Sequence, residues 1–130
     1  MREGLSGAGQ TLPRYRRIGR REGFDLSPGA DVVSNHWFVV YARKNRFGVF
    51  RLGVTVAKRI APLAVSRNLA KRLVRNGFRR AFSRGSVPPG LGVNVIVRVR
   101  RQIDRKTAQD AAAALARLLN EVRAKVGVVA

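Results

Sequence analysis

The sequence predicts an α+β fold built around a single sheet. Two segments, 49–57 and 92–100, carry apolar residues at every second position, as strands with one buried face do. Two others, 66–82 and 107–127, repeat apolar residues at intervals of three and four, as amphipathic helices do. The chain has 130 residues, of which 45% are hydrophobic, enough for one core shared by all of these elements.

The N-terminal part is expected to hold a tail and a short basic helix. Residues 1–12 are rich in glycine and predict a flexible tail, which leaves 13–130 as a single domain. Residues 14–24, RYRRIGRREGF, predict a helix interrupted by Gly19, and Ser-Pro-Gly at 27–29 ends it.

Strands are expected next. Residues 36–42, HWFVVYA, are aromatic and β-branched, and RKNRFG at 43–48 reads as the turn into the strand at 49–57. Alternation puts Phe50, Leu52, Val54 and Val56 on one face of that strand and Val49, Arg51 and Thr55 on the other. Two or three strands are therefore expected before the first long helix, which follows Pro62.

That helix should have one apolar and one basic side. Ser66 is the expected N-cap and Gly85 the expected C′ residue. The apolar arc consists of Ala70, Val74, Phe78 and Phe82, with Leu69, Leu73 and Ala81 beside them. The basic arc consists of Arg67, Lys71, Arg72, Arg75 and Arg79.

The C-terminal third predicts a turn, a strand and a second helix. VPPG at 87–90 is the turn, and in the strand Val93, Val95, Val97 and Val99 face one way while Asn94, Ile96, Arg98 and Arg100 face the other. Thr107 and Asp110 resemble a capping box at the helix start, and Gly127 closes the helix.

The charge of the chain points to a polyanionic partner. There are 27 Lys and Arg residues against 7 Asp and Glu, a net charge of +20, and no acid occurs between Asp31 and Asp104. Surfaces of one sign repel themselves unless a partner supplies the opposite charge. Polyphosphate is the usual partner, and arginine, which dominates here, offers a planar fork of donors for it.

Residues for independent catalysis are scarce. A protein that cleaved phosphodiesters alone would use a general base, a nucleophile or carboxylates that hold metal ions. The chain has no cysteine and one histidine, His36, whose place beside Trp37 is more typical of polar packing. The absence of cysteine fits a reducing compartment, and without an apolar leader or span we expect a cytoplasmic protein.

Two adjoining segments carry a resemblance to a known family. VAKRI, followed by SRNLAKRLVRNGFRRAF from Ser66, resembles the bacterial ribonuclease P protein subunit, whose signature is Arg-Asn-Arg-x-x-Arg-or-Lys on a helix after a basic turn. The matching positions are Lys58, Arg59, Arg67, Asn68, Lys71, Arg72 and Arg75. Leu69 stands where the family usually has its second arginine. The similarity extends to the segments FVVY, RLGVTVAKR, VPPG and VIVRVR and to the closing helix.

The resemblance implies a fold, partners and a reaction. The fold would be an αβββαβα sandwich with a left-handed crossover, similar to a domain of some ribosomal proteins. The protein would bind, one copy per RNA, to the catalytic RNA of ribonuclease P and assist endonucleolytic removal of the 5′ leader from precursor tRNA. Chemistry would belong to that RNA and to Mg²⁺ held mainly by it.

Two groups of side chains are the expected sites. The RNA-binding group comprises Lys58, Arg59, Arg67, Asn68, Lys71, Arg72, Arg75 and Arg79. The leader-binding cleft would use Phe24, Phe38 and Tyr41, which could stack on bases or simply pack in the core. Arg98, Arg100 and Arg101 could extend the basic surface or form a solvated strand end.

Other functions fit the same composition. A plain RNA-binding or ribosome-assembly protein would have the same charge and take no part in cleavage. A protein-only nuclease would cleave without RNA, and a basic amphipathic helix could lie on an anionic membrane. The apolar side of the 66–82 helix is needed for the core, which disfavours the membrane alternative.

Overall fold

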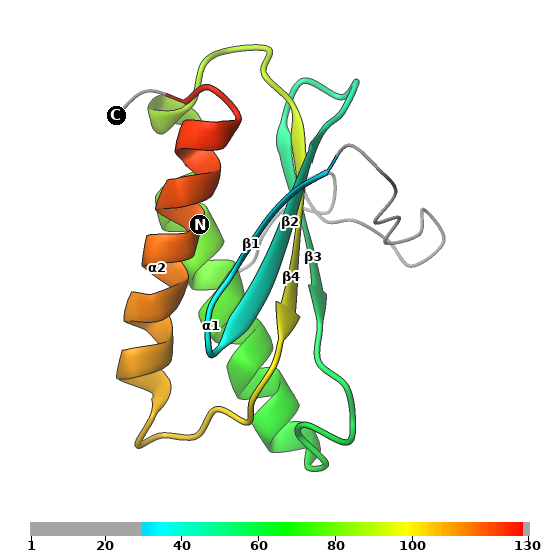
Figure 1. Ribbon diagram of the computed structural model, residues 1–130, viewed down its shortest axis with the longest axis vertical. Coiled ribbons are helices and arrows are strands. Elements are labelled where there is room, and N and C mark those ends of the chain that lie inside the picture. Colours follow the sequence, from blue (N-terminus) through cyan, green and yellow to red (C-terminus); the bar gives the residue numbers. More distant parts are fainter. Residues whose placement is uncertain (1–29, 129–130) are drawn as a thin grey trace, which may run out of the picture.

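The structure, a computed structural model, describes residues 30–128. This part of the chain forms four strands, two long helices and one short 3-10 helix (Figure 1). In chain order they are β1 (Asp31–Ser34), β2 (Phe38–Lys44), β3 (Phe50–Thr55), α1 (Ala64–Ala81), η3 (Arg84–Ser86), β4 (Val93–Val99) and α2 (Ala108–Lys125). The α+β class is confirmed, and three strands precede α1. The expected tail and N-terminal helix lie outside the described residues.

The four strands form one mixed sheet in the order β1-β2-β4-β3. β2 pairs antiparallel with both β1 and β4, while β3 pairs parallel with β4. Two parallel neighbours need a crossover, and α1 supplies it between β3 and β4. The left hand of this crossover stays a prediction.

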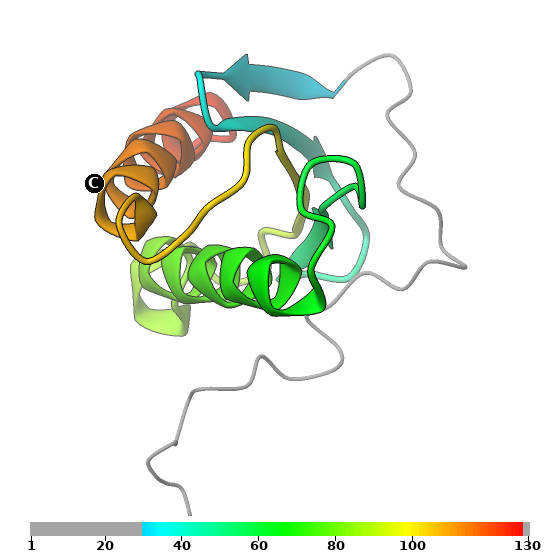
Figure 2. The same ribbon diagram turned by 90° about the horizontal axis from the view of Figure 1, so that it is seen from below.

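Both helices cover one face of the sheet (Figure 2). The register aligns Val40 with Val97 and Leu52 with Val95, so the alternating apolar residues of three strands share this face, as predicted. Its central side chains are shielded from water by the apolar sides of α1 and α2. The largest fully buried side chains include Phe38, Phe50, Phe78, Phe82, Ile103, Leu115 and Leu119.

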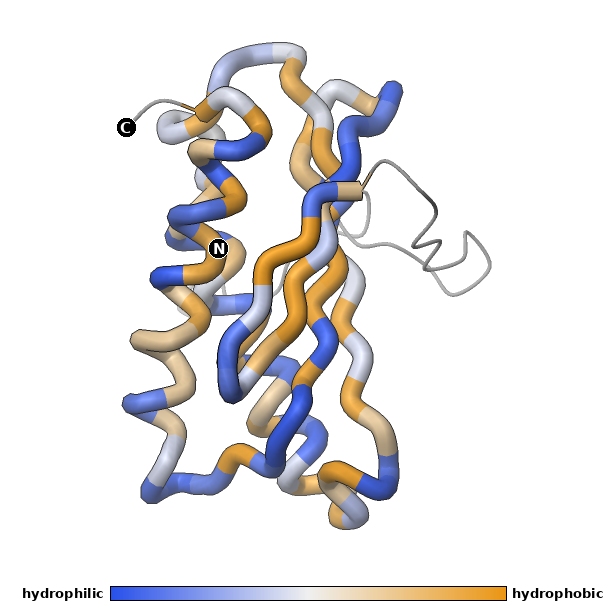
Figure 3. The backbone as a smooth tube through the Cα atoms, viewed as in Figure 1, coloured by the Kyte–Doolittle hydropathy of each residue, from blue (hydrophilic) through white to orange (hydrophobic). Residues whose placement is uncertain are grey.

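The opposite face of the sheet, which the helices do not cover, carries most of the polar residues of the strands. Tyr41 lies beside Ile96, and Arg43 lies beside Asn94, which is also the partner of Arg51. Hydrophilic residues gather at the turn between β2 and β3 and at the end of β4 (Figure 3). The two ends of the sheet are therefore its most polar parts.

The ends of α1 differ from the prediction. The helix begins at Ala64 with Leu63 as N-cap, so Ser66 lies inside the first turn, and no side chain caps the start. It ends at Ala81 with Phe82 as C-cap, which leaves Gly85 in η3. Pro62 fixes the start because a proline imposes an extended conformation on its predecessor. The helix gains a turn at its N-terminus as a result.

The start of α2 is organised by Asp104 instead of the predicted capping box. Thr107 is the N-cap, but its side chain makes no capping hydrogen bond to the helix. The Asp104 carboxylate accepts hydrogen bonds from the backbone N–H groups of Lys106 and Thr107 and from the Thr107 hydroxyl, at 2.9–3.0 Å. The bonds from Thr107, backbone first, lower the pKa of Asp104.

The end of α2 follows the prediction. Gly127 has a φ of +89°, a left-handed conformation that glycine adopts without steric cost. The N–H of Gly127 donates to the carbonyl of Ala124, and that of Val128 donates to the carbonyl of Arg123. This pair of bonds is a Schellman motif, which satisfies carbonyls that the helix end leaves open.

The second strand begins two residues later than predicted. The side-chain oxygen of Asn35 accepts hydrogen bonds from the N–H groups of Trp37 and Phe38, at 2.9 and 3.0 Å. This turn separates β1 from β2, so His36 and Trp37 belong to it and not to the strand. The described residues contain no helix with the length and apolar character needed to cross a membrane.

Candidate nucleic-acid interface

The basic side of α1 lies opposite its buried side. Ala70, Val74 and Phe78 are buried, and Arg72 and Asn68 are exposed about half a turn away. The apolar stripe fixes the rotation of the helix because it must face the sheet and α2. The cations of the basic arc are thereby held toward solvent.

Several of these cations have no side-chain partner among the residues that the structure describes. No side-chain hydrogen bond or ion pair joins Lys58, Arg59, Lys71, Arg72 or Arg75 to another residue of the described chain. Surface cations usually find carboxylates nearby, but this sequence provides none between Asp31 and Asp104. Their donors are available to an external anion.

A hollow of about 860 Å³ collects cations from three elements. Arg59 follows β3, Lys71 and Arg75 belong to α1, and Arg98 and Arg100 lie at the end of β4; all five line the hollow. Apolar side chains such as Val39 and Ile60 complete its wall, and no carboxylate lines it. Such a surface can neutralise phosphates while its apolar wall accepts sugars or bases.

The hollow depends on tertiary structure. The side chain of Arg98 lies on the face of β4 that the helices do not cover. In the sequence, the turn at 87–90 and most of β4 separate Arg98 from α1. The parallel pairing of β3 with β4 brings their ends together beside the start of α1. Sequence reasoning left Arg98 and Arg100 undecided, and the structure places both with the α1 cations.

Arg67 differs from the other cations of the helix. Its Nη1 donates to the carbonyl oxygens of Ala61 and Pro62, both at 2.9 Å. These bonds close the loop that leads into α1 and half-bury the side chain. Arg67 therefore has a structural role, while Asn68 beside it is exposed.

Arg79 is also engaged within the helix. It donates to the side-chain oxygen of Asn76, one turn earlier, and its Nε is buried without a hydrogen-bond partner. Of the predicted RNA-binding group, Arg67 and Arg79 thus have side-chain hydrogen bonds, whereas Lys71, Arg72 and Arg75 have none to another of residues 30–128.

The aromatic part of the predicted site needs a correction. Phe38 is 0% exposed, on the face of the sheet covered by the helices, so no base can stack on it while the core is intact. Tyr41 lies on the opposite face and is half-buried. Phe24 lies outside the described residues. Of the two alternatives for Phe38, stacking on a base and packing in the core, the structure supports core packing; the sequence did not decide between them because alternation does not say which face of the strand is covered.

One exposed aromatic was missed by the sequence interpretation. Phe47 lies in the β2–β3 turn and is 62% exposed, and the guanidinium carbon of Arg51 lies 4.4 Å from its ring centroid. The signal was an aromatic among basic residues in the turn RKNRFG. Stacking pairs of this kind are typical of nucleic-acid surfaces.

The described residues offer little for catalysis. Among residues 30–128 no three His, Cys, Asp or Glu side chains are grouped to hold a metal ion. Nδ1 of His36 lies 3.2 Å from Arg101, and its ring packs edge-on against Trp37 at 5.8 Å. The histidine is engaged in packing at the start of β2.

Comparison with known proteins identifies the family. Residues 12–123 match the family model described as Ribonuclease P. This chain belongs to the ribonuclease P family. The resemblance carried by the α1 signature is therefore confirmed.

Individual relatives agree with the family match. The ribonuclease P protein component of Halorhodospira halophila is 39% identical over 74 residues, which span 55% of this chain and 61% of the relative, less than two thirds of its length. The solved RNase P protein of Thermotoga maritima is 29% identical, with a TM-score of 0.60 over 82% of this chain and 94% of that one. The solved RNase P protein of Staphylococcus aureus is 28% identical, with a TM-score of 0.61 over 87% of this chain and 96% of that one.

Proposed function

We propose that this protein is the protein subunit of a ribonuclease P ribonucleoprotein, in which it assists removal of the 5′ leader from precursor tRNA. One observation carries the proposal: Arg59, Lys71 and Arg75, which have no side-chain hydrogen bond or ion pair to another of residues 30–128, lie with Arg98 and Arg100 around a hollow that no carboxylate of these residues lines. Family membership supplies the class of RNA partner.

The exposed cations and the hollow have different tasks in this proposal. Arg72 and Asn68 lie on the exposed side of α1, where they dock on the catalytic RNA. The hollow, with Lys71, Arg75 and Arg98, takes the single-stranded leader, whose phosphates pair with the cations and whose bases meet the apolar wall. Contacts to phosphates carry no sequence information, which suits a leader whose sequence varies among precursors.

Chemistry belongs to the RNA partner in this proposal. Mg²⁺ held by the RNA would supply the Lewis-acid chemistry of the cleavage. The protein contributes binding and orientation, which lower the concentration of divalent ion that the assembly requires. One protein copy per RNA and a cytoplasmic location complete the proposal.

Reconstitution tests this division of labour. The purified protein, freed of RNA, is assayed on precursor tRNA alone and after addition of a ribonuclease P RNA at low Mg²⁺. We expect cleavage at the mature 5′ end only in the second case. A plain RNA-binding protein would stimulate no cleavage, and a protein-only nuclease would cleave without added RNA; either result would refute the proposal.

The same assay can separate the two proposed surfaces. An Arg72→Ala variant should lower affinity for the catalytic RNA, whereas Arg75→Ala should lower affinity for precursor tRNA more than for mature tRNA. Binding of the holoenzyme to both tRNAs is measured beside binding of the free protein to the catalytic RNA.

A further inference from the structure

The β2–β3 turn is built as a fixed support for its exposed aromatic. The side-chain oxygen of Asn45 accepts a hydrogen bond from the N–H of Phe47 at 2.8 Å. The Asn45 amide nitrogen donates to the carbonyl of Val49 at 3.2 Å and to the side-chain oxygen of Asn94 on β4 at 2.8 Å. One asparagine thus ties the turn to itself and to the neighbouring strand.

Two glycines make this arrangement possible. Gly48 has a φ of +72°, which reverses the chain directly after Phe47. Gly92 lies beneath the turn, where a Cβ would come within 2.1 Å of Asn45 Oδ1 and 2.7 Å of the Gly48 nitrogen. Because the turn is tightly packed against β4, the position of Phe47 is set before any ligand arrives.

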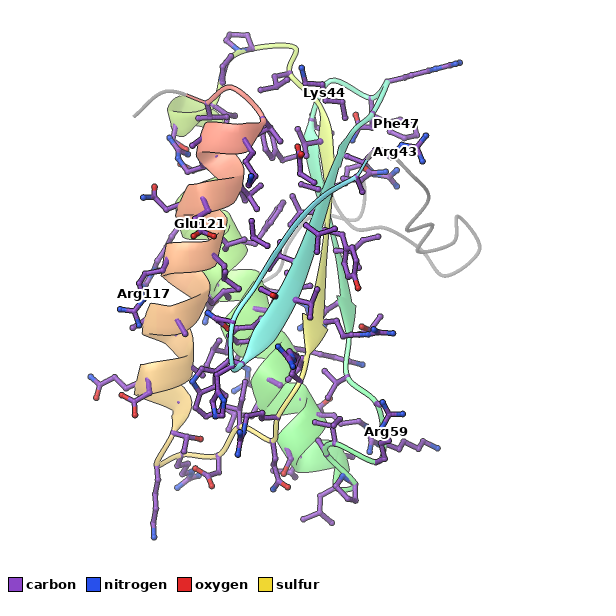
Figure 4. All side chains as sticks on the ribbon, viewed as in Figure 1. Arg43, Lys44, Phe47, Arg59, Arg117 and Glu121 are labelled. Carbon is purple, nitrogen blue, oxygen red and sulfur yellow. The ribbon has the colours of Figure 1, made fainter. Side chains whose placement is uncertain are left out.

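Phe47 is largely exposed, and its ring contacts a cation. Its ring is 62% exposed, and Arg51 stacks on it at 4.4 Å, although Arg51 itself is buried. Arg43 and Lys44, both exposed, lie at the same end of the sheet as Phe47 (Figure 4), and the exposed Arg46 belongs to the turn itself. A protein partner with an apolar surface would have to desolvate these cations, whereas single-stranded RNA offers both phosphates and a ring to stack.

We infer that Phe47 and Arg51 form a stacking platform for one base of single-stranded RNA, and that this base belongs to the 5′ leader beyond the part held in the hollow. The inference rests on the proposed function for the identity of the RNA. Phosphates on either side of the stacked base pair with the exposed cations of the turn. The Arg51 guanidinium supports the ring from one side and adds its own charge.

The position of the turn favours the leader over other RNA. The hollow extends along β3 as far as Leu52, and Phe47 lies in the turn that leads into the start of β3. A strand that leaves the hollow along this edge of the sheet therefore reaches Phe47, while Arg59 and the start of α1 lie at the other end of the sheet (Figure 4).

A leader-length series tests the platform in the reconstituted holoenzyme. Dissociation constants are measured for precursor tRNAs whose leaders grow by one nucleotide at a time, with wild-type protein and with Phe47→Ala. We expect equal affinities for short leaders and, above one threshold length, a loss in the variant of about fivefold to a hundredfold. Phe47→Trp should keep the full affinity because it preserves the stacking face.

Controls separate the platform from other causes. Val32→Ala removes another exposed apolar side chain, 52% exposed, and should leave the length dependence unchanged. A fluorescent purine analogue, placed at successive leader positions, should be quenched at one position with wild-type protein and not with Phe47→Ala. Thermal melting should be the same for all variants because Phe47 lies outside the core.

The outcomes are distinguishable from failure of the proposed function. If Phe47→Ala binds long leaders as well as wild type does, no platform exists. If it loses affinity equally for leaderless tRNA or for the catalytic RNA alone, the stacked base belongs to another RNA and the leader assignment is wrong. Failure of the proposed function would instead appear with wild-type protein, as absence of cleavage after RNA is added.

Discussion

The guanidinium of Arg67 donates a hydrogen bond to the carbonyl oxygen of Ala61, at 2.9 Å. Ala61 is buried, so this bond satisfies a carbonyl at the edge of the core and fixes the loop from which α1 starts. Four residues later on the same helix, Lys71 makes no such bond and lines the hollow. Neighbouring cations of one basic helix therefore have different roles.

Arg67→Ala should lower stability as well as RNA affinity. The substitution leaves two carbonyl oxygens without their charged donor, which costs about 1–2 kcal/mol because the site is only partly buried. Urea unfolding measures this change, with Lys71→Ala as the matched control that should lose RNA affinity alone. Equal unfolding midpoints for the two variants would show that the Arg67 bonds contribute nothing.

Charge reversal at Lys71, Arg72 and Arg75 together should abolish tight RNA binding and leave the fold intact. None of the three has a partner within the described chain, so the helix loses no contact. Each phosphate contact that disappears should reduce the slope of log affinity against log salt by about 0.7–0.9. Filter binding over a salt series and thermal melting measure the two effects. A collapse of the melting temperature would mean that these cations are structural.

Arg98→Gln should weaken precursor tRNA more than mature tRNA. Arg98 is exposed on the outward face of β4 and lines the hollow, so its loss removes one phosphate contact to the leader and no buried contact. Discrimination between the two tRNAs is measured with the holoenzyme. Arg117→Gln, on the exposed side of α2 and outside the hollow, is the control and should not alter it (Figure 4). An unchanged ratio with Arg98→Gln would exclude the hollow as the leader site.

Acid should remove the stabilisation that Asp104 gives to the start of α2. Hydrogen bonds from Thr107 lower the folded-state pKa of Asp104 below 3.8, so the carboxylate stabilises the fold above 3.8 and this contribution disappears as pH falls through the lowered value. Denaturant unfolding of wild type and Asp104→Ala is compared from neutral pH to below 3.8. The difference should shrink on acidification; a constant difference would show that the ionised form is not required.

The positions of the strands and helices along the chain follow from local patterns. Apolar residues at every second position in 93–99, and at intervals of three and four in 108–125, mark the side of each element that is buried. Helix ends were harder to predict. Ser66 and the Thr107–Asp110 pair have suitable cap chemistry, but Pro62 and Asp104 control the loops that decide where the helices begin.

The basic character of the site was predictable from the sequence, but the identity of its exposed aromatic residue was not. The α1 cations stand out because no acid accompanies them, and the family signature selects the same positions. Phe38, one of the expected leader-binding aromatics, is buried, and Phe47, for which no role was predicted, is exposed. Alternation along β2 does not say which of its two faces the helices cover, so the burial of Phe38 depends on tertiary packing.

By itself, the sequence determined the α+β class, the basic side of α1 and the family, and it led us to expect a polyanionic partner. These properties depend on composition and on neighbours within a few positions of the chain. The tertiary structure decided which cations lack a hydrogen-bond partner within residues 30–128, that Arg98 and Arg100 join Lys71 and Arg75, and that Phe47 and not Phe38 is presented to solvent. Those outcomes depend on contacts between distant segments, above all the parallel pairing of β3 with β4, which no local pattern encodes.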